Sequence, residues 1–264
     1  MCTKRVCALF FRVPMSIRNL QRISIENLTK NGFATLPIRN EDEQQIIEKV
    51  FEHIGGFTSF RFPPIEERGV YTEEIRDVFR LFFRVAVHVL EQILHTLDKT
   101  TDVERILLQC EQAKTLLLFS DPNEPLSSTD PLAGTFFNLF HYDHGCLNTH
   151  RDRYLVTVIC AKPAKTAQEG QNLAHSALWV RSPSSGVWRN VDLLLTEPTW
   201  IVFVGEECTR ICSDAGYNIH ASEHCIRLNP DGEYISHSHH QPDPESLPVG
   251  NRRSIAMVLG ERYG

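Results

Sequence analysis

The sequence predicts an α+β fold that is mainly β, with a helical amino-terminal layer packed outside an antiparallel barrel or jelly roll. Apolar residues recur with the helical period of about 3.6 in the first half of the chain. From residue 116 onward this period gives way to short runs rich in Val, Ile, Leu, Thr and Trp, separated by Pro, Gly, Ser and Asp. We therefore expect three parts: residues 1–22 as an extension, 23–115 as a helical region of the same domain, and 116–264 as the β core.

The composition sets limits on the class of protein. A chain of 264 residues with 42% hydrophobic and 23% charged residues can bury a full core as one large domain or two small ones. The net charge of −6 argues against a broad nucleic-acid-binding surface. The eight cysteines are scattered through a chain too large to need disulfides, so we expect them to be reduced in an intracellular, cytoplasmic protein.

The amino terminus leaves a second compartment open. No apolar run approaches the length of a membrane-spanning helix, and "CALFF" is too short for the core of a secretory signal, so no membrane partner is expected. The first acidic residue is Glu26, however, and five basic residues precede it: Lys4, Arg5, Arg12, Arg18 and Arg22. This bias is typical of a mitochondrial presequence, which makes residues 1–22 a targeting candidate.

Two β-prone runs and a helix open the structured part of the chain. Residues 23–38 hold the two runs around a Lys-Asn-Gly turn signal. A helix follows, because Asn40 is placed to cap it, with Glu43 three residues on. Its apolar side chains share one face before a Gly-Gly pair ends it: Ile46, Ile47, Val50, Phe51 and Ile54.

Two further helices complete the amino-terminal part. The longer one begins at Thr72, where two glutamates suit the positive end of the helix dipole. Its apolar stripe indicates packing against a sheet and consists of Ile75, Phe79, Phe82, Ala86, Val89, Ile93 and Leu97. A third helical stretch spans 101–115, and strands are expected from "LLLF" at 116 onward. "SPSSG" at 182–186 predicts a hairpin turn.

The triplet His150-Arg151-Asp152 within "THRDRYLVTVI" has two interpretations. As the HRD of a protein kinase it needs an Asn five residues after the Asp, and Thr157 stands there. The DFG, the APE and the glycine-rich loop of a kinase are also missing from the sequence. The alternative is an HxD metal pair, in which strand alternation points His150 and Asp152 to one face and Arg151 to the other.

An HxD pair needs a third ligand to form a facial triad of two histidines and one carboxylate, which leaves open positions on iron. "NIHASEHCIRL" offers His220 and His224. We favour His224 because it opens a β-prone run. A second HxD, His141-Tyr142-Asp143, is followed by loop-like sequence, which favours ordinary polar residues at a strand end.

Another pair with the same spacing lies at the head of the last strand, in "NRRSIAMVLG". A guanidinium and a hydroxyl at Arg252 and Ser254 can hold a carboxylate by bidentate, charge-assisted hydrogen bonds. The alternative is a surface arginine pair beside a solvated serine.

Three motifs follow one another along the sequence: HxD before "VTVI", a late His, and RxS before the last strand. In this order they resemble the motifs of the iron(II)/2-oxoglutarate-dependent dioxygenase superfamily, in particular its isopenicillin-N-synthase-like branch. The resemblance implies a double-stranded β-helix (jelly roll), with iron on His150, Asp152 and His224 as the catalytic centre. It further implies that Arg252 and Ser254 hold the cosubstrate 2-oxoglutarate. "NGFATLPI" and "NLFHY" are similar to strands that open such enzymes and precede their HxD.

The chain also departs from the branch. Gly205-Glu206 stands where the branch tends to have Gly-Asp, and the segments from Asp152 to His224 and from His224 to Arg252 are longer. The insertion at 229–251 is expected to be a loop or hairpin at the barrel mouth. Its histidines are solvated or line a substrate entrance: His237, His239 and His240.

The resemblance implies an oxygenase that uses iron(II), 2-oxoglutarate and O2, hydroxylates or otherwise oxidises a small molecule, and releases succinate and CO2. The alternative is a non-catalytic jelly-roll binding protein that has kept the fold. A structural zinc site on Cys208, Cys212, His220 and His224 is disfavoured, because the spacer between the second Cys and the first His is shorter than the roughly twelve residues of a ββα finger.

Overall fold

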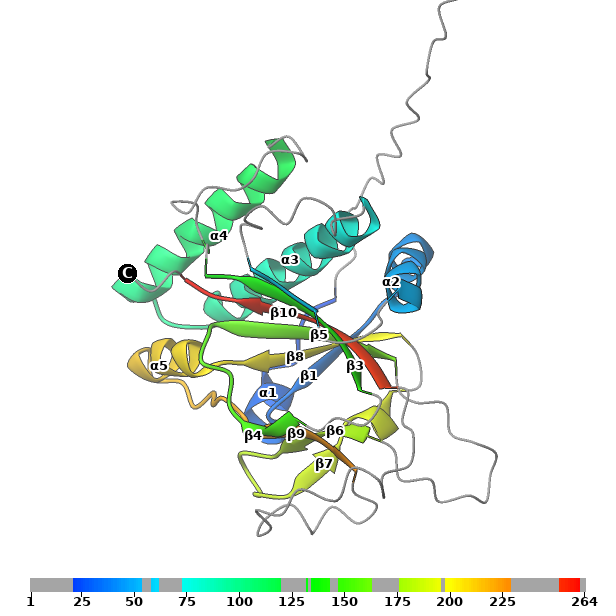
Figure 1. Cartoon of the computed structure of the whole chain (residues 1–264). Coiled ribbons are helices and arrows are strands. Elements are labelled where there is room, and N and C mark those ends of the chain that lie inside the picture. The colour runs from blue at the N-terminus through cyan, green and yellow to red at the C-terminus, as the bar shows by residue number, and fades with distance from the viewer. Residues whose placement is uncertain are drawn as a thin grey trace, which may run out of the picture.

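Two antiparallel sheets and a layer of helices form the described part of the chain (Figure 1). The structure is a computed structural model that describes residues 21–53, 58–61, 73–119, 132, 134–142, 147–162, 176–195, 198–228 and 252–261. The expected combination of helices with antiparallel β-structure is confirmed. Residues 1–20 of the basic extension, Asp143 and the histidines of the 229–251 insertion lie outside the described residues.

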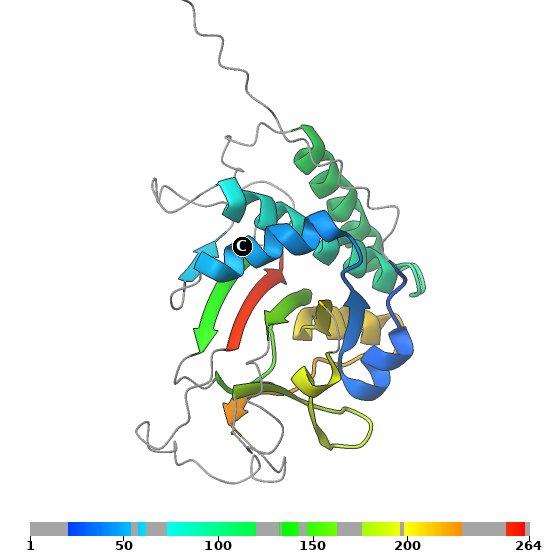
Figure 2. The same ribbon diagram turned by 90° about the vertical axis from the view of Figure 1, so that its right-hand side faces the viewer.

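The helices come mainly from the first half of the chain. They are α1 (Ile25–Asn31), α2 (Glu41–His53), α3 (Glu73–Leu94), α4 (Thr101–Phe119), α5 (Glu206–Asp214) and the short 3₁₀ helix η2 (Asp192–Leu194). Helices α2, α3 and α4 lie on one face of the larger sheet, and the smaller sheet lies on its other side (Figures 1 and 2).

The larger sheet has six strands in the order β1-β8-β5-β10-β3-β2, and the smaller has four in the order β4-β9-β6-β7. The larger contains β1 (Ala34–Pro37), β2 (Thr58–Arg61), β3 (Phe136–Tyr142), β5 (Val156–Lys162), β8 (Thr199–Val204) and β10 (Arg252–Leu259). The smaller contains β4 (Leu147–His150), β6 (Ser176–Arg181), β7 (Trp188–Asn190) and β9 (His224–Leu228). The 23–115 region thus supplies two strands as well as the helical layer.

The apolar stripe predicted for α3 faces the larger sheet and forms the core beneath the helices. Phe82 is fully buried, with its ring edge-on to Trp200 at a centroid distance of 4.7 Å and to Phe137 at 5.5 Å. Trp200 lies on β8 and Phe137 on β3, so one aromatic side chain of the helix contacts two strands of the sheet. This packing holds the helical layer on the sheet.

The prediction of two β-prone runs at 23–38 is wrong for the first run. Residues 25–31 form α1, because the Ser24 side chain caps it by accepting from the Asn27 backbone N–H. Gly32 ends it in the left-handed conformation at φ 84°, which favours glycine. The Lys-Asn-Gly signal is therefore the end of a helix, and only the second run is a strand, β1.

The prediction that strands start at residue 116 is also wrong, because α4 continues through "LLLF" to Phe119. Leucine is a strong helix former, and nothing in this stretch breaks the helix. Other boundaries agree with expectation. The Asn40 side chain caps α2 by accepting from the Asp42 and Glu43 N–H groups, and "SPSSG" connects β6 and β7 with Gly186 at φ 69°.

Alternation along β10 separates two cores. Ile255, Met257 and Leu259 belong to the core between the larger sheet and the helices. Ser254 lies on the opposite face, paired across the sheet with Ala161, a member of the core between the two sheets. Arg252 shares that face with Ser254, since the two are two residues apart on one strand. The region between the sheets is therefore where the predicted carboxylate-binding pair lies.

Among the described residues, no helix combines the length and apolar character needed to span a bilayer. The five cysteines whose side chains are described are free and buried, which agrees with the expectation of reduced thiols for these five.

We expect Phe82→Ala to lower the free energy of unfolding by about 3–5 kcal/mol, because it leaves a cavity between α3 and the larger sheet. Leu108→Ala on α4 is a matched control, since Leu108 is 59% exposed and its loss should change stability by no more than about 0.5 kcal/mol. Urea unfolding measures both. Equal losses in the two variants would contradict the packing described for Phe82.

A second prediction concerns two carboxylates between α5 and the end of β10. Burial, together with the charge of Glu261 and a hydrogen bond with it, raises the pKa of Glu207 to about 7. Since this folded pKa lies above the ordinary value of a glutamate, the stabilising effect of the proton is complete at low pH and is lost as pH rises through about 7. We expect Glu207→Gln to raise the melting temperature at pH 8 and to change it little at pH 5. The neighbouring, exposed Glu206→Gln should change it at neither pH, and a gain for Glu207→Gln that is no larger at pH 8 than at pH 5 would refute the assignment.

Candidate metal centre

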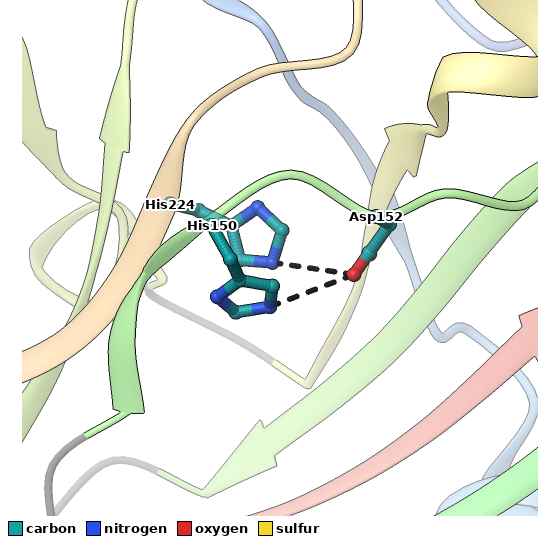
Figure 3. Close-up of side chains that lie close together, drawn as sticks. All are labelled: His150, Asp152 and His224. Atoms are coloured by element: carbon teal, nitrogen blue, oxygen red, sulfur yellow. Dashed lines mark ion pairs between the residues drawn. The ribbon is translucent and has the colours of Figure 1, made fainter.

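Three side chains converge where the ends of β4 and β9 meet the loop that leads into β5. Nε2 of His150 lies 3.6 Å and Nε2 of His224 lies 3.8 Å from Oδ1 of Asp152 (Figure 3). One potential ligand atom from each residue lies within 4.8 Å of the other two. Within the described part of the chain, this is the one group of three or more His, Cys, Asp or Glu side chains close enough to hold a metal ion.

Strand pairing sets the two imidazoles side by side. His150 is the last residue of β4 and lies directly opposite His224, the first residue of β9. Each ring uses Nδ1 to contact the backbone carbonyl two residues earlier, Asn148 for His150 at 2.7 Å and Ser222 for His224 at 3.1 Å. With Nδ1–H donating to a carbonyl, the Nε2 lone pair is left for a metal.

His224 is held more rigidly than His150. Its side chain is 6% exposed, and its ring stacks on Phe203 of β8, with centroids 4.9 Å apart and planes 7° from parallel. Burial, together with the charge of His150, lowers the pKa of His224 despite the opposing effect of Asp152. The neutral imidazole that a metal requires is therefore the favoured form at neutral pH.

Asp152 reaches the same point from a loop, so the expectation that His150 and Asp152 lie on one strand is wrong. β4 ends at His150 and β5 begins at Val156. The Thr157 hydroxyl donates to Oδ2 of Asp152 at 2.5 Å, which directs Oδ1 toward the two histidines.

The backbone of this loop is anchored against the start of α5. The Asp152 carbonyl accepts from the Glu206 N–H at 2.8 Å. Residue 205 must be glycine, because a Cβ there would lie 1.9 Å from the Tyr154 carbonyl oxygen. The Gly-Glu pair that the sequence showed in place of Gly-Asp thus fixes the loop carrying the carboxylate.

The protonation states suit a divalent cation. Burial would raise the pKa of Asp152, but its contacts with His150, His224 and Thr157 hold that pKa below the usual value. The hydrogen bond to Asp152 raises the pKa of His150, against the effect of burial. An ionised carboxylate beside two imidazoles attracts a cation. Of the two imidazoles, His150 is the one at which a proton competes with the metal ion.

The geometry and chemistry of these donors fit iron(II). Bonds of about 2.0–2.2 Å place neighbouring ligand atoms roughly 3 to 3.5 Å apart around one ion. The separations from Asp152 to the two histidines, 3.6 and 3.8 Å, exceed this by a few tenths of an ångström, and all three ligand atoms lie within 4.8 Å of one another. Two imidazoles and one carboxylate on one side of an ion are typical of non-haem iron(II) oxygenase sites.

The rival ligands lie elsewhere. His220 is exposed and contacts the Asn218 side chain at 2.5 Å. Cys208 and Cys212 are buried on α5 in the core beneath the helices, with their sulfurs 3.9 Å apart. Arg151 points outward, where it is half-exposed and pairs with Glu223 at 3.1 Å.

Arg252 and Ser254 are both buried, so the surface interpretation of this pair is wrong. Arg252 donates from Nε to Oδ2 of Asp192 at 2.7 Å and from Nη2 to Oδ1 at 3.1 Å. Oδ2 of Asp192 also accepts from the Leu178 N–H at 3.1 Å. A buried carboxylate of the chain itself therefore contacts the predicted carboxylate clamp.

Sequence reasoning missed Phe203, Thr157 and Asp192. Thr157 had a usable signal, because a hydroxyl at the start of an apolar strand is placed to contact a carboxylate just before it. Phe203 is one of several apolar residues on β8, and Asp192 lies in a short 3₁₀ helix 60 residues from its partner, so neither had a local signal.

No family model and no curated protein matches this sequence. Solved structures do show similarity. A protein of Shewanella oneidensis proposed to be an oxygenase has a TM-score of 0.47 at 15% identity, covering 90% of this chain and 84% of that one. A carboxy-terminally truncated protein of Neurospora crassa in its apo form has a TM-score of 0.44 at 16% identity, covering 89% and 85%. A prolyl-4-hydroxylase of Pseudomonas putida has a TM-score of 0.35 at 13% identity, covering 90% and 92%.

We expect His224→Ala to weaken metal binding by at least about hundredfold, because it removes the most rigidly held of the three donors. His220→Ala is the matched control, since it removes an exposed imidazole four residues away and should leave affinity unchanged. Anaerobic calorimetric titration with iron(II) measures both. Loss of binding in the His220 variant with retention in the His224 variant would reverse the assignment.

Proposed function

We propose that the chain is an iron(II)- and 2-oxoglutarate-dependent oxygenase that oxidises a small molecule, most simply by hydroxylation, and releases succinate and CO2. The observation that carries the proposal is the convergence of three donor atoms, Nε2 of His150, Nε2 of His224 and Oδ1 of Asp152. Both imidazoles have their second nitrogen on a backbone carbonyl, which is the arrangement that orients a metal-binding histidine.

The strand order supports a jelly-roll fold. From β3 to β10 the chain supplies four strands to each sheet, β3, β5, β8 and β10 to the larger and β4, β6, β7 and β9 to the smaller. Eight antiparallel strands in two facing sheets are the pattern of a jelly roll. In this fold the metal-binding ends of β4 and β9 lie at one rim, and the core between the sheets lies below them.

His150, Asp152 and His224 would hold iron(II) and leave its remaining positions open for a 2-oxo acid and O2. When bound, iron(II) with 2-oxoglutarate and O2 supplies a two-electron oxidation. One oxygen atom replaces hydrogen on a substrate carbon as hydroxyl, and the other enters succinate as 2-oxoglutarate loses CO2.

The protein's own groups orient the reactants and exclude water. Phe203 stacks on His224 and shields that ring from solvent, while Thr157 fixes the rotation of the Asp152 carboxylate. Arg252 and Ser254, which are buried on the face of β10 toward the core between the sheets, would receive the distal carboxylate of 2-oxoglutarate. The small-molecule nature of the substrate remains an expectation of the resemblance.

The test is cosubstrate binding and turnover by the purified full chain. Under anaerobic conditions, iron(II) and 2-oxoglutarate together should give a visible charge-transfer absorption. Admission of O2 should then yield succinate, even slowly without the true substrate. We expect His150→Ala to lose both signals and Arg252→Lys to raise KM for 2-oxoglutarate severalfold, since an ammonium lacks the bidentate fork.

A protein that binds iron(II) but gives neither the absorption band nor succinate with 2-oxoglutarate would instead be a jelly-roll binding protein. Full succinate formation by His150→Ala would refute the metal assignment itself.

A further inference from the structure

We infer that Asp192 is a specificity-determining residue of the cosubstrate subsite: its carboxylate neutralises Arg252, so that the site discriminates weakly between 2-oxo acids with and without a distal carboxylate. This inference rests on the proposed function. It concerns which 2-oxo acid the site accepts.

The contacts between the two side chains are those of a bound carboxylate. Both oxygens of Asp192 are engaged by the guanidinium, Oδ2 by Nε at 2.7 Å and Oδ1 by Nη2 at 3.1 Å. The Arg252 side chain is 1% exposed and that of Asp192 is 8% exposed, so water screens the pair little. The chain thus presents to Arg252 the same two-oxygen fork that the distal end of 2-oxoglutarate would present.

Asp192 contacts β6 at Leu178, two residues along that strand from Val180, the partner of His224. His224 pairs with Val180 across the smaller sheet, and the next inward-facing pair is Ile226 with Leu178, whose N–H donates to Asp192. Two residues along a strand correspond to roughly 7 Å. A five-carbon 2-oxo acid that has its keto end at the metal and extends along these strands would bring its distal carboxylate toward Arg252 and Asp192.

Asp192 opposes that carboxylate in either of two arrangements. If the distal carboxylate replaces Asp192 on the guanidinium, a buried ion pair must be broken, and the displaced carboxylate must find other donors. If the two carboxylates share the guanidinium, two like charges lie a few ångströms apart where screening is weak. Both arrangements reduce the advantage that an arginine alone would give a dicarboxylate.

A purely structural role is the competing interpretation. Asp192 also accepts from the Leu178 N–H and so connects η2 to β6. In that case its charge would have no bearing on cosubstrate choice. Binding of two acids that differ only in the distal carboxylate separates the interpretations.

The first experiment uses the unaltered chain. Loaded anaerobically with iron(II), it is titrated with 2-oxoglutarate and with 2-oxovalerate, the five-carbon 2-oxo acid that has a methyl group in place of the distal carboxylate. We expect the two Kd values to lie within about tenfold of each other, because the subsite is already neutral. A preference for 2-oxoglutarate greater than that overturns the inference.

The second experiment removes the charge and keeps the shape. Asp192→Asn retains an acceptor oxygen, and we expect it to tighten 2-oxoglutarate about tenfold while leaving 2-oxovalerate unchanged, which is the size expected of one nearby charge in a weakly screened site. Asp214→Asn is the matched control, since Asp214 is exposed on α5 and pairs with Arg210. Unchanged or weaker 2-oxoglutarate binding in Asp192→Asn would assign Asp192 a structural role alone.

The outcomes also separate this inference from the proposed function. If neither acid binds the iron-loaded unaltered chain, the oxygenase proposal fails. If both bind but the Asp192 charge does not affect their ratio, only the inference about Asp192 fails. Should Asp192→Asn not fold, the comparison on the unaltered chain still decides it.

Discussion

The pairing of β4 with β9 is the constraint on which the rest of the site depends. It places His150 directly opposite His224, and each imidazole is then oriented by a carbonyl of its own strand or of the residues just before it. Because both Nδ1 atoms are engaged, the two Nε2 atoms face the same space, and only a carboxylate from a third direction is needed to complete a metal site. Asp152 supplies it from the loop that crosses between the sheets.

The two cores have different roles: one stabilises the helical layer on the larger sheet, and the other borders the metal site. The core beneath the helices holds α3 on the larger sheet and contains no part of the metal site. The core between the sheets is smaller, and its members border the site: Phe203 stacks on His224, and Leu178 with Ile226 is the next inward-facing pair after Val180 with His224. Polar groups enter that core in pairs, Thr157 with Asp152 and Asp192 with Arg252, because a buried polar group needs a partner.

The features that were predicted correctly from the sequence are those set by residues close to one another along the chain. The capping of α2 by Asn40, the buried stripe of α3 and the opening of β9 at His224 each follow from residues within a few positions of one another. The order of the motifs along the sequence also predicted the three donors, His150, Asp152 and His224. The α1 segment was misassigned from the sequence, since the same Lys-Asn-Gly signal suits a turn or a helix end, and only the Ser24 cap and the burial of Leu28 distinguish them.

Tertiary contacts were beyond prediction from sequence. The position of Asp152 in a loop depends on Thr157 and on the approach of Gly205 to Tyr154, and the pairing of Asp192 with Arg252 joins segments 60 residues apart.

A crystal structure of the chain loaded anaerobically with iron(II) is the most direct measurement of the central claim. It should show one iron about 2.0–2.2 Å from Nε2 of His150, Nε2 of His224 and an oxygen of Asp152. Iron bound at other residues, or coordination that omits either histidine, would contradict the account.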